Sequence, residues 1–277
     1  MTEKFINLGC GSLFIENSQW INLDFNPSKK TIQKANLLES LPLKDNSASV
    51  VYSSHFFEHI PLSFIQDFLK ECFRVLKPNG VLRLVLPDFE KMARSYLEYR
   101  ENENHIKADF VVVEIIDQCV RRKSGGQLSH LYKKFSEKTN LENKEMINFV
   151  RERTGENLHK RASSYATKNK MIQKIYKIPN VLISRLQRVW INLWLLGLPS
   201  AFRKQNISLA QIGELHQWLW DFYQVRTELK AAGFNGIIKS TANTSLVHDF
   251  PFYPLDLDAD GLPRKGNQSM FVEAYKS

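Results

Sequence analysis

The sequence of 277 residues contains little cysteine and lacks the signals of a secreted or membrane-spanning chain. Its cysteines, Cys10, Cys72 and Cys119, lie far apart and match no metal-ligand spacing, so reduced thiols and a cytoplasmic location are expected. An apolar run begins within the first five residues and leads directly into glycines, which predicts no signal peptide. A longer apolar run, 178–202, is interrupted by arginine, glutamine and asparagine and is a poor membrane span.

Charge is distributed unevenly along a chain whose composition is otherwise that of a soluble globular protein, with 43% hydrophobic and 24% charged residues. The net charge is +9. Residues 101–210 contain 20 Lys and Arg against 10 Asp and Glu, a balance of +10, whereas the remainder contains 18 against 19, a balance of −1. This contrast predicts an inserted region with a partner of its own.

Strand-like and helix-like patterns alternate near both ends of the chain, and no internal repeat interrupts them. This alternation is typical of βαβ units and a mostly parallel sheet. We expect one α/β domain formed by residues 1–100 and 211–277, with a basic helical insertion at 101–210. The expected strands are 4–8, 20–24, 47–55, 81–87, 236–244 and 269–276, and the expected helices are 61–76 and 219–233.

A glycine turn, "GCG", directly follows the first expected strand. Only eleven residues separate the first two strands, so any helix between them is limited to a turn or two. The backbone N–H groups of Gly9, Cys10 and Gly11 can approach an anionic or zwitterionic group closely, because glycine has no Cβ. Asp24 ends the second strand, where a carboxylate can accept hydrogen bonds from the hydroxyls of a ribose. Together these features predict a nucleotide-type site.

Six segments, in order along the chain, resemble a known enzyme family. The segments "FINLGCG", "WINLDF", "ANLLESLPLKDNSASVVYSSHFFEHI", "ECFRVLKPNGVLRLVLPD", "LHQWLWDFYQVRTELKAAGF" and "SMFVEAYK" are similar to class I S-adenosylmethionine-dependent methyltransferases. The nearest resemblance is to the type 11-like bacterial predicted methyltransferases of glycan and lipopolysaccharide gene clusters, over about residues 4–100 and 211–277. It implies a Rossmann-like sheet, mostly parallel with an antiparallel last strand, S-adenosyl-L-methionine as cofactor, and a methyltransferase activity (EC 2.1.1.-).

The resemblance also implies which residues bind the cofactor. Asn36 stands where many members have an acid, and its amide oxygen can still accept a hydrogen bond from the adenine amino group. Cys10 is expected to fill the tight turn rather than act as a nucleophile. The implied contacts are Gly9, Cys10 and Gly11 to the methionine part, Asp24 and Phe25 to the ribose, Asn36, Leu37 and Leu38 to the adenine, and Ser54 and His55 near the sulfonium.

A base would assist transfer of the methyl group to a hydroxyl, and three residues are candidates. In order they are His55, His216 and Asp88, the last two at positions where the resemblance includes a histidine and an acid. For each, a role as a helix cap or a hydrogen-bonded packing residue is an equal alternative. His59 is expected to pack or cap, and Glu58 to be a solvated charge rather than a base.

The segment "DLDADG", residues 256–261, begins like a calcium-binding loop. Asn267 occupies the twelfth position, where such loops use a bidentate glutamate, and no flanking helices are evident. We therefore expect an acidic surface turn and no bound metal.

The leading functional hypothesis is O-methylation of a sugar, a glycan or another small-molecule acceptor, with the basic insertion capping the site. One alternative is methylation of RNA or DNA through the basic insertion, whose aromatic residues, such as Tyr132 and Phe135, would stack on bases. The N/D-P-P-Y/F signature of base amino methylation is absent, which disfavours this alternative. A further alternative is a non-catalytic module that binds the cofactor and docks a partner or a membrane.

The apolar segment at the end of the insertion, residues 178–204, allows more than one interpretation. Trp190 and Trp194 are four residues apart and lie on one helical face, with basic residues before and after them. The favoured interpretation is a helix packed on the main domain; the alternatives are a lid over an apolar substrate and a peripheral contact with the inner face of the membrane. The acceptor atom and the oligomeric state do not follow from the sequence.

Overall fold

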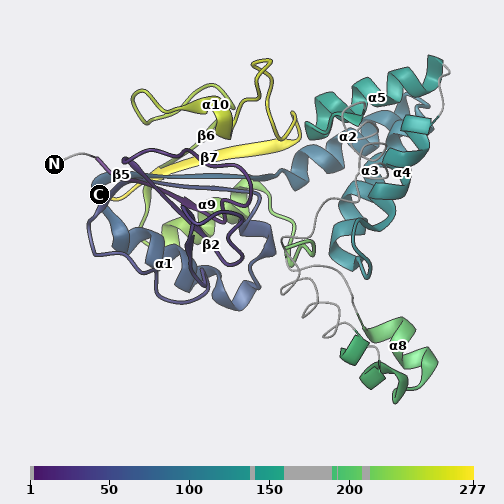
Figure 1. The fold of residues 1–277 in the computed structure, drawn as a ribbon. Coiled ribbons are helices and arrows are strands. Elements are labelled where there is room, and N and C mark those ends of the chain that lie inside the picture. The colour runs from purple at the N-terminus through teal and green to yellow at the C-terminus, as the bar shows by residue number, and fades with distance from the viewer. Residues whose placement is uncertain (1–2, 138–140, 159–188, 192, 208–212) are drawn as a thin grey trace.

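A sheet of seven strands forms the centre of the computed structural model, which describes residues 3–137, 141–158, 189–191, 193–207 and 213–277 (Figure 1). The strand order is β3-β2-β1-β4-β5-β7-β6. Strands β1 to β5 pair in parallel, and β7 runs antiparallel to both of its neighbours, as expected. The strands are β1 (Phe5–Leu8), β2 (Trp20–Asp24), β3 (Gln33–Lys34), β4 (Ala48–Ser54), β5 (Leu76–Pro87), β6 (Asn235–Ser240) and β7 (Ser269–Tyr275).

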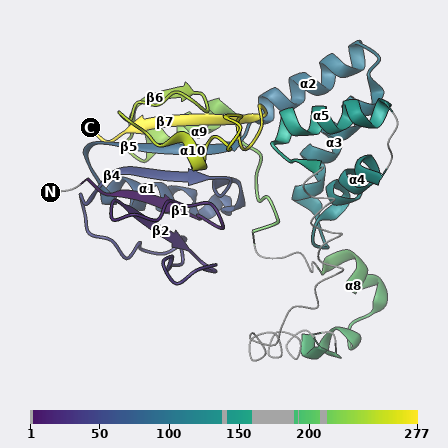
Figure 2. The same ribbon diagram turned by 45° about the horizontal axis from the view of Figure 1, so that its top comes forward.

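Helices cover the sheet and extend beyond it. Figure 1 shows α1 and α9 on one side of the sheet, α10 on the other, and α2 to α5 grouped beyond one end; Figure 2 shows the same grouping from another direction. The helices are the 3-10 helices η1 (Phe57–His59) and η2 (Leu62–Phe64), and α1 (Ile65–Val75), α2 (Phe89–Glu101), α3 (His105–Val120), α4 (Gly126–Glu137), α5 (Leu141–Thr154), α8 (Ser200–Asn206), α9 (Phe222–Ala231) and α10 (Phe252–Leu255).

The helix expected after the third long strand forms α1 because its apolar residues recur at helical spacing. Ile65, Phe68, Leu69, Cys72 and Val75 are all buried and belong to the largest core cluster, which also includes residues of α9. These residues pack α1 against one face of the sheet. No helix occurs in residues 9–19 between β1 and β2, which agrees with the short crossover predicted.

The opposite face of the sheet contains a buried ionic network that the sequence analysis did not anticipate. Arg83 on β5 is fully buried and lies opposite Glu273 on β7, to which it is paired at 2.7 Å. Arg83 also pairs with Asp256 at 2.9 Å, and Asp256 accepts a hydrogen bond of 2.8 Å from the hydroxyl of Tyr52. The prediction that residues 256–261 form a surface turn is therefore wrong for Asp256, because its carboxylate belongs to the core.

The rest of the "DLDADG" segment does form a turn. Asp258 Oδ1 accepts hydrogen bonds from the backbone N–H groups of Asp260 and Leu262, at 2.9 and 3.0 Å. Its other oxygen pairs with Arg151 on α5. Since Asp256 and Asp258, at the first and third positions of the segment, already have protein partners, this turn is not arranged as a calcium loop.

The described part of residues 101–210 is mainly helical and contains a core of its own. Phe110 on α3 packs with Tyr132 and Phe135 of α4 and with Val150 of α5. Helix α2, which lies within the segment assigned to the sheet domain, packs along α3. Because Tyr132 and Phe135 are buried, neither ring is available to stack on a nucleic-acid base.

The tryptophan segment does not pack on the main domain where it is described, so the favoured interpretation was wrong. Residues 189–191 and 193–196 are helical, and the side chains of Trp190 and Trp194 are 65% and 70% exposed. Their ring centroids are 5.7 Å apart, which confirms that they share a face. Within the described residues, no helix has the length and apolar character needed to cross a membrane. Residues 178–188 lie outside the described residues.

Candidate functional site

The turn after β1 requires glycine at its first position. Gly9 has φ +65°, and a Cβ added there would lie 2.8 Å from the ring of Phe56. Gly11 has φ +54°, but a Cβ there would meet nothing within 4 Å. Left-handed backbone favours glycine at both positions, and only Gly9 is also restricted by a close neighbour.

The amides of this turn are used within the protein. The N–H groups of Gly9 and Cys10 donate to the carbonyl oxygen of Leu23, at 3.0 and 3.3 Å. The N–H of Gly11 donates to Asp24 Oδ2 at 2.8 Å. The structure therefore ties the turn to the end of β2, and these amides do not point free N–H groups at a ligand as we had expected. The turn therefore offers a ligand open space beside Gly11 and no free N–H donor from these three residues.

A cavity of about 230 Å³ adjoins the glycine turn. Five of the ten residues predicted to bind the cofactor line it: Gly9, Cys10, Gly11, Ser54 and His55. Six other residues line the cavity and were not predicted: two are on strands, two directly follow the glycine turn, and two come from α10 and the loop after it. These are Asn7, Ser12, Leu13, Tyr52, Leu255 and Lys265.

The other predicted cofactor contacts lie outside this lining. Asp24 is connected to it through Gly11, and its second oxygen, Oδ1, accepts a hydrogen bond of 2.7 Å from the N–H of Asn26. Phe25 is half exposed, whereas Leu37 is buried in the main core and Leu38 is only partly buried. The side chain of Asn36 bonds Glu39 and the N–H of Leu38. Their roles toward an adenosine remain predictions.

Cys10 has the environment of a packed thiol. Its side chain is buried, and burial together with the nearby Asp24 carboxylate raises the pKa of the thiol to about 12. A thiol with this pKa is protonated at neutral pH and is a poor nucleophile. This result agrees with the prediction that Cys10 fills the turn.

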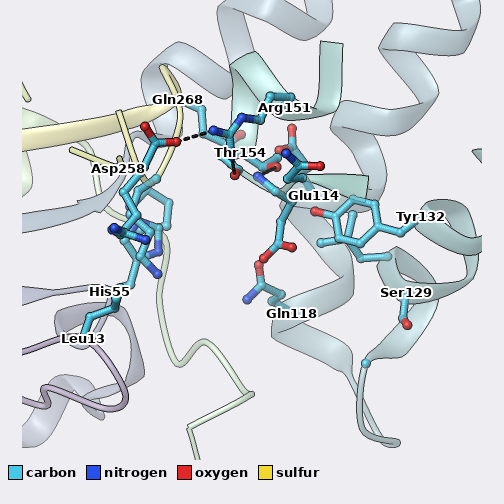
Figure 3. Close-up of a pocket in the computed structure, with 18 of the residues that line it drawn as sticks. Leu13, His55, Glu114, Gln118, Ser129, Tyr132, Arg151, Thr154, Asp258 and Gln268 are labelled. Atoms are coloured by element: carbon cyan, nitrogen blue, oxygen red, sulfur yellow. Dashed lines mark hydrogen bonds and ion pairs between the residues drawn. The ribbon is translucent and has the colours of Figure 1, made fainter. Parts of the chain in front are cut away.

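A second, larger cavity of about 710 Å³ lies between the end of the sheet and the helices α3 to α5 (Figure 3). Its lining is mainly polar and includes Gln118 of α3 and Arg151 of α5. Leu13, His55 and Lys265 line both this cavity and the smaller one. The two cavities are therefore neighbours that meet at these three side chains.

His55 occupies the position between the cavities in a strained backbone conformation. Its φ is +51°, and its N–H donates to the carbonyl of Val85 at 2.7 Å, which fixes it at the end of β4. Ring atom Nε2 lies 3.0 Å from Ser269 Oγ, and Nδ1 lies 3.3 Å from Glu58 Oε1. Burial, and to a lesser extent the charge of Lys265, holds the pKa of His55 well below its usual value of 6.5.

Lys265 is the cation shared by the two cavities. Burial lowers the pKa of its ammonium group below 10.5, although Glu58 and Glu156 act in the opposite direction. Among the described residues, no acidic group lies within ion-pair distance of Lys265. It follows the acidic turn in a loop without periodicity, so no sequence pattern indicated it.

The other two candidate bases line neither cavity. Asp88 caps α2 by accepting the N–H of Lys91 at 3.2 Å, and it pairs with Lys239 at 2.6 Å. His216 is buried next to Glu58 and His59. For Asp88 and His216 the structure supplies the capping or packing role that was the alternative to catalysis.

Glu58 is not a solvated charge, so that prediction was wrong. Its side chain is 1% exposed, and neither carboxylate oxygen has a hydrogen-bond partner among the described residues. Burial raises the pKa of this carboxyl group. His59, as expected, packs: its Nδ1 lies 2.9 Å from the carbonyl oxygen of Leu215, and its ring meets that of His216 edge to face at 4.8 Å.

Comparison with known proteins gives one family match. Residues 16–84 match a family described as a methyltransferase domain. This segment contains β2 to β4, α1 and most of β5, and hence Asp24 and His55. No curated protein matches the chain.

Solved structures similar to the chain include several methyltransferases. An S-adenosylmethionine-dependent methyltransferase from Mesorhizobium loti is 18% identical, with 32% of this chain and 47% of that chain covered and a TM-score of 0.27. One from Archaeoglobus fulgidus is 12% identical, with 99% and 86% covered and a TM-score of 0.39. The chain spans less than half the length of three of the matched structures, at 39%, 47% and 45%.

Proposed function

We propose that this chain is a class I S-adenosylmethionine-dependent methyltransferase that transfers a methyl group to an oxygen of a polar acceptor, such as a sugar or a glycan; residues 16–84 match a methyltransferase domain. One observation carries the proposal: the cavity at the glycine turn and the larger polar cavity meet at Leu13, His55 and Lys265. A methyl transfer needs a donor and an acceptor in adjoining sites, held in line and shielded from water.

S-Adenosylmethionine is the cofactor of this family, and the residues beside the glycine turn fit it. A Cβ at Gly11 would meet nothing within 4 Å, so a ligand can approach the backbone closely there. Each oxygen of Asp24 accepts one backbone N–H and keeps a further lone pair for a ribose hydroxyl. When bound, the cofactor supplies a methyl group made electrophilic by the sulfonium.

The lining of the larger cavity supports a hydroxyl-rich acceptor. Arg121 and Arg151 are already paired with Asp117 and Asp258, so their charges are largely balanced within the protein. Amide and carboxyl groups such as Gln118 and Glu114 can exchange hydrogen bonds with hydroxyls (Figure 3). Lys265, which lacks an ion pair in the described structure, suits one anionic group on the acceptor or the cofactor.

His55 is the candidate base that geometry favours, because only it among the three lines both cavities. In this role a ring nitrogen of His55 accepts the proton of the acceptor hydroxyl, a contribution of about 10²–10⁴ in rate. Asp88 and His216 instead hold the surrounding elements in place.

Transfer of a labelled methyl group tests this function directly. The full chain would be incubated with labelled S-adenosylmethionine and with nucleotide sugars, lipid-linked glycans and RNA, and the products identified by mass spectrometry. We expect label on a carbohydrate oxygen, and a His55→Asn variant that loses about 10²-fold or more in kcat. His130→Asn, an exposed change on α4, is the matched control and should retain the wild-type rate. Label on RNA alone would contradict the acceptor class.

A second proposal concerns a partner: the exposed tryptophan segment contacts a membrane surface from the cytoplasmic side. Trp190, Leu193, Trp194 and Leu196 are each 59–70% exposed. Exposed apolar groups next to basic residues are typical of helices that lie in the membrane interface. This arrangement would hold the enzyme near a lipid-linked acceptor.

A further inference from the structure

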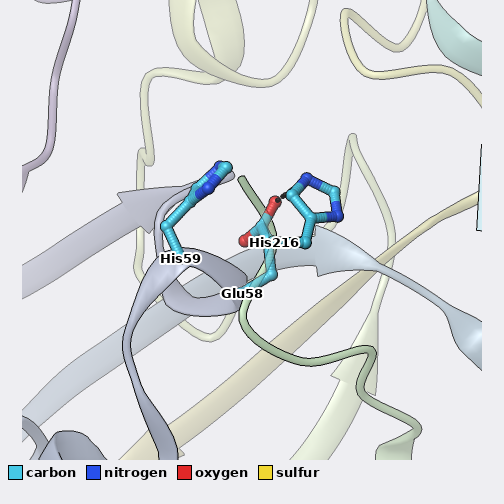
Figure 4. A group of neighbouring side chains, drawn as sticks. All are labelled: Glu58, His59 and His216. Atoms are coloured by element: carbon cyan, nitrogen blue, oxygen red, sulfur yellow. Dashed lines mark ion pairs between the residues drawn. The ribbon is translucent and has the colours of Figure 1, made fainter. Parts of the chain in front are cut away.

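Three side chains of metal-ligand type meet outside both cavities. Glu58 and His59 come from η1, and His216 comes from the loop that precedes α9 (Figure 4). One possible ligand atom from each side chain lies within 4.8 Å of the other two. We propose that Glu58, His59 and His216 bind a divalent transition-metal cation of the Zn²⁺ class. The sequence predicted no metal: Glu58 and His216 are 158 positions apart, so local spacing could not show the cluster.

The strongest reason is the lack of protein partners for buried polar atoms. Glu58 is 1% exposed, and both of its carboxylate oxygens lack a hydrogen-bond partner among the described residues. His216 is 5% exposed, and its Nδ1 likewise lacks one. Buried polar groups are nearly always hydrogen-bonded. Among the described residues, the ion-pair neighbours of Glu58 are imidazole nitrogens, His55 Nδ1 at 3.3 Å and His216 Nε2 at 4.0 Å, and these balance its charge only when they are protonated. A bound cation satisfies these atoms together.

Neighbouring groups fix both histidines of the cluster, and His59 is held as a metal-ligating histidine usually is. The Nδ1 of His59 lies 2.9 Å from the carbonyl oxygen of Leu215, so Nδ1 carries the proton and Nε2 keeps a free lone pair. His216 is fixed by Gln118, whose backbone carbonyl oxygen accepts its backbone N–H at 2.9 Å and whose side-chain amide nitrogen lies 2.8 Å from its Nε2. Metal binding through Nδ1 of His216 requires the Gln118 amide to be turned so that its oxygen accepts the Nε2 proton. The ring nitrogen Nε2 of His216 is also 4.0 Å from Glu58 Oε1.

The spacing and the chemistry of the ligands indicate the class of ion. Ligand atoms about 2.1 Å from Zn²⁺ in a tetrahedron are about 3.4 Å apart, so the three side chains would each move inward by less than about 1 Å. Two imidazoles and one carboxylate suit Zn²⁺ and similar cations better than Mg²⁺ or Ca²⁺, which prefer oxygen ligands. His59 is partly exposed and provides a side for the ion to enter.

Lys265 is the alternative source of positive charge for Glu58. The two groups interact electrostatically, but they do not form an ion pair in the described structure. A Lys265→Met variant separates the two explanations. If the cluster is a metal site, removal of this charge leaves metal binding intact or strengthens it. If Lys265 alone balances Glu58, the cluster binds no metal in either protein.

Metal content of the full chain is the first test. The protein would be purified without a metal-affinity resin, dialysed against Zn²⁺ and then against metal-free buffer, and analysed by mass spectrometry of the metal. We expect about one zinc per chain, and at least about tenfold weaker binding in Glu58→Gln and His216→Asn. The control His130→Asn, exposed on α4, should bind as the wild type does. No zinc in the wild type, or equal zinc in Glu58→Gln, would overturn the proposal.

A spectroscopic test on the wild type avoids the possibility that a variant fails to fold. Co²⁺ bound by two histidines and a carboxylate should give visible d–d absorption that Zn²⁺ removes, without thiolate charge-transfer bands. Thiolate bands would place the ion at a cysteine and would overturn the assignment. Both tests read metal binding alone, so they are independent of methyl transfer.

Discussion

Replacement of Asp24 by asparagine should weaken cofactor binding strongly while preserving the fold. Asp24 Oδ2 accepts the N–H of Gly11 at 2.8 Å, and Oδ1 accepts the N–H of Asn26 at 2.7 Å. Asparagine has the same size and keeps one of these acceptors, but it removes the charge and turns an NH₂ group toward the other donor. A hydrogen bond to a charged group contributes about 1.5–3 kcal/mol, so the loss of one such bond to a ribose hydroxyl weakens binding by about 10- to 150-fold.

Titration calorimetry with S-adenosylhomocysteine is the appropriate assay, because it reports binding without an acceptor. Asp67→Asn, an exposed change on α1, is the matched control and should bind as the wild type does. Thermal unfolding of each variant shows whether the turn at Gly11 is intact. If Asp24→Asn binds within about twofold of a wild type that does bind, the ribose lies elsewhere and the reasoning is refuted.

Three further predictions concern the core, the turn and the exposed segment. Arg83→Met leaves two buried carboxylates without their cation and should lower the free energy of unfolding by about 3–5 kcal/mol, measured by urea denaturation; a loss below about 1 kcal/mol would contradict the network. Gly9→Ala should lower the unfolding free energy by more than Gly11→Ala, since both strain a left-handed backbone by about 1–2 kcal/mol but only the first meets an aromatic ring; equal melting temperatures would show that the ring gives way. Wild-type protein should float with anionic liposomes and the double variant Trp190→Glu, Trp194→Glu should not; equal flotation would reject the membrane contact.

The fold could be predicted because each periodic pattern of apolar residues can be buried by only one type of secondary structure. The stripe from Ile65 to Val75 can be buried only on a helix, and the short apolar runs that begin β1 and β4 can be buried only in a covered sheet. The short connection after Leu8 likewise left no room for a long helix. Each of these elements is determined by residues that are close together in the sequence, so its pattern can be read from the sequence alone.

The site could be predicted only where it follows the ends of strands. Gly9 and His55 directly follow β1 and β4, so a parallel sheet brings them to one edge. Lys265 lies in the loop after α10 and reaches the site only because the fold brings this loop beside the turn after β1. Glu58 is buried beside His216, which is distant in sequence. Sequence spacing cannot reveal a burial that the tertiary fold creates, and Glu58 was accordingly mistaken for a surface charge.

The most direct test of a cofactor site at the glycine turn is a crystal structure of the full chain with S-adenosylhomocysteine. Electron density should show the amino-acid part beside Gly9 and Gly11, the ribose hydroxyls on the carboxylate of Asp24, and the sulfur facing His55. Density for the compound at any other place, with the cavity beside Gly9 filled by protein side chains, would contradict the account.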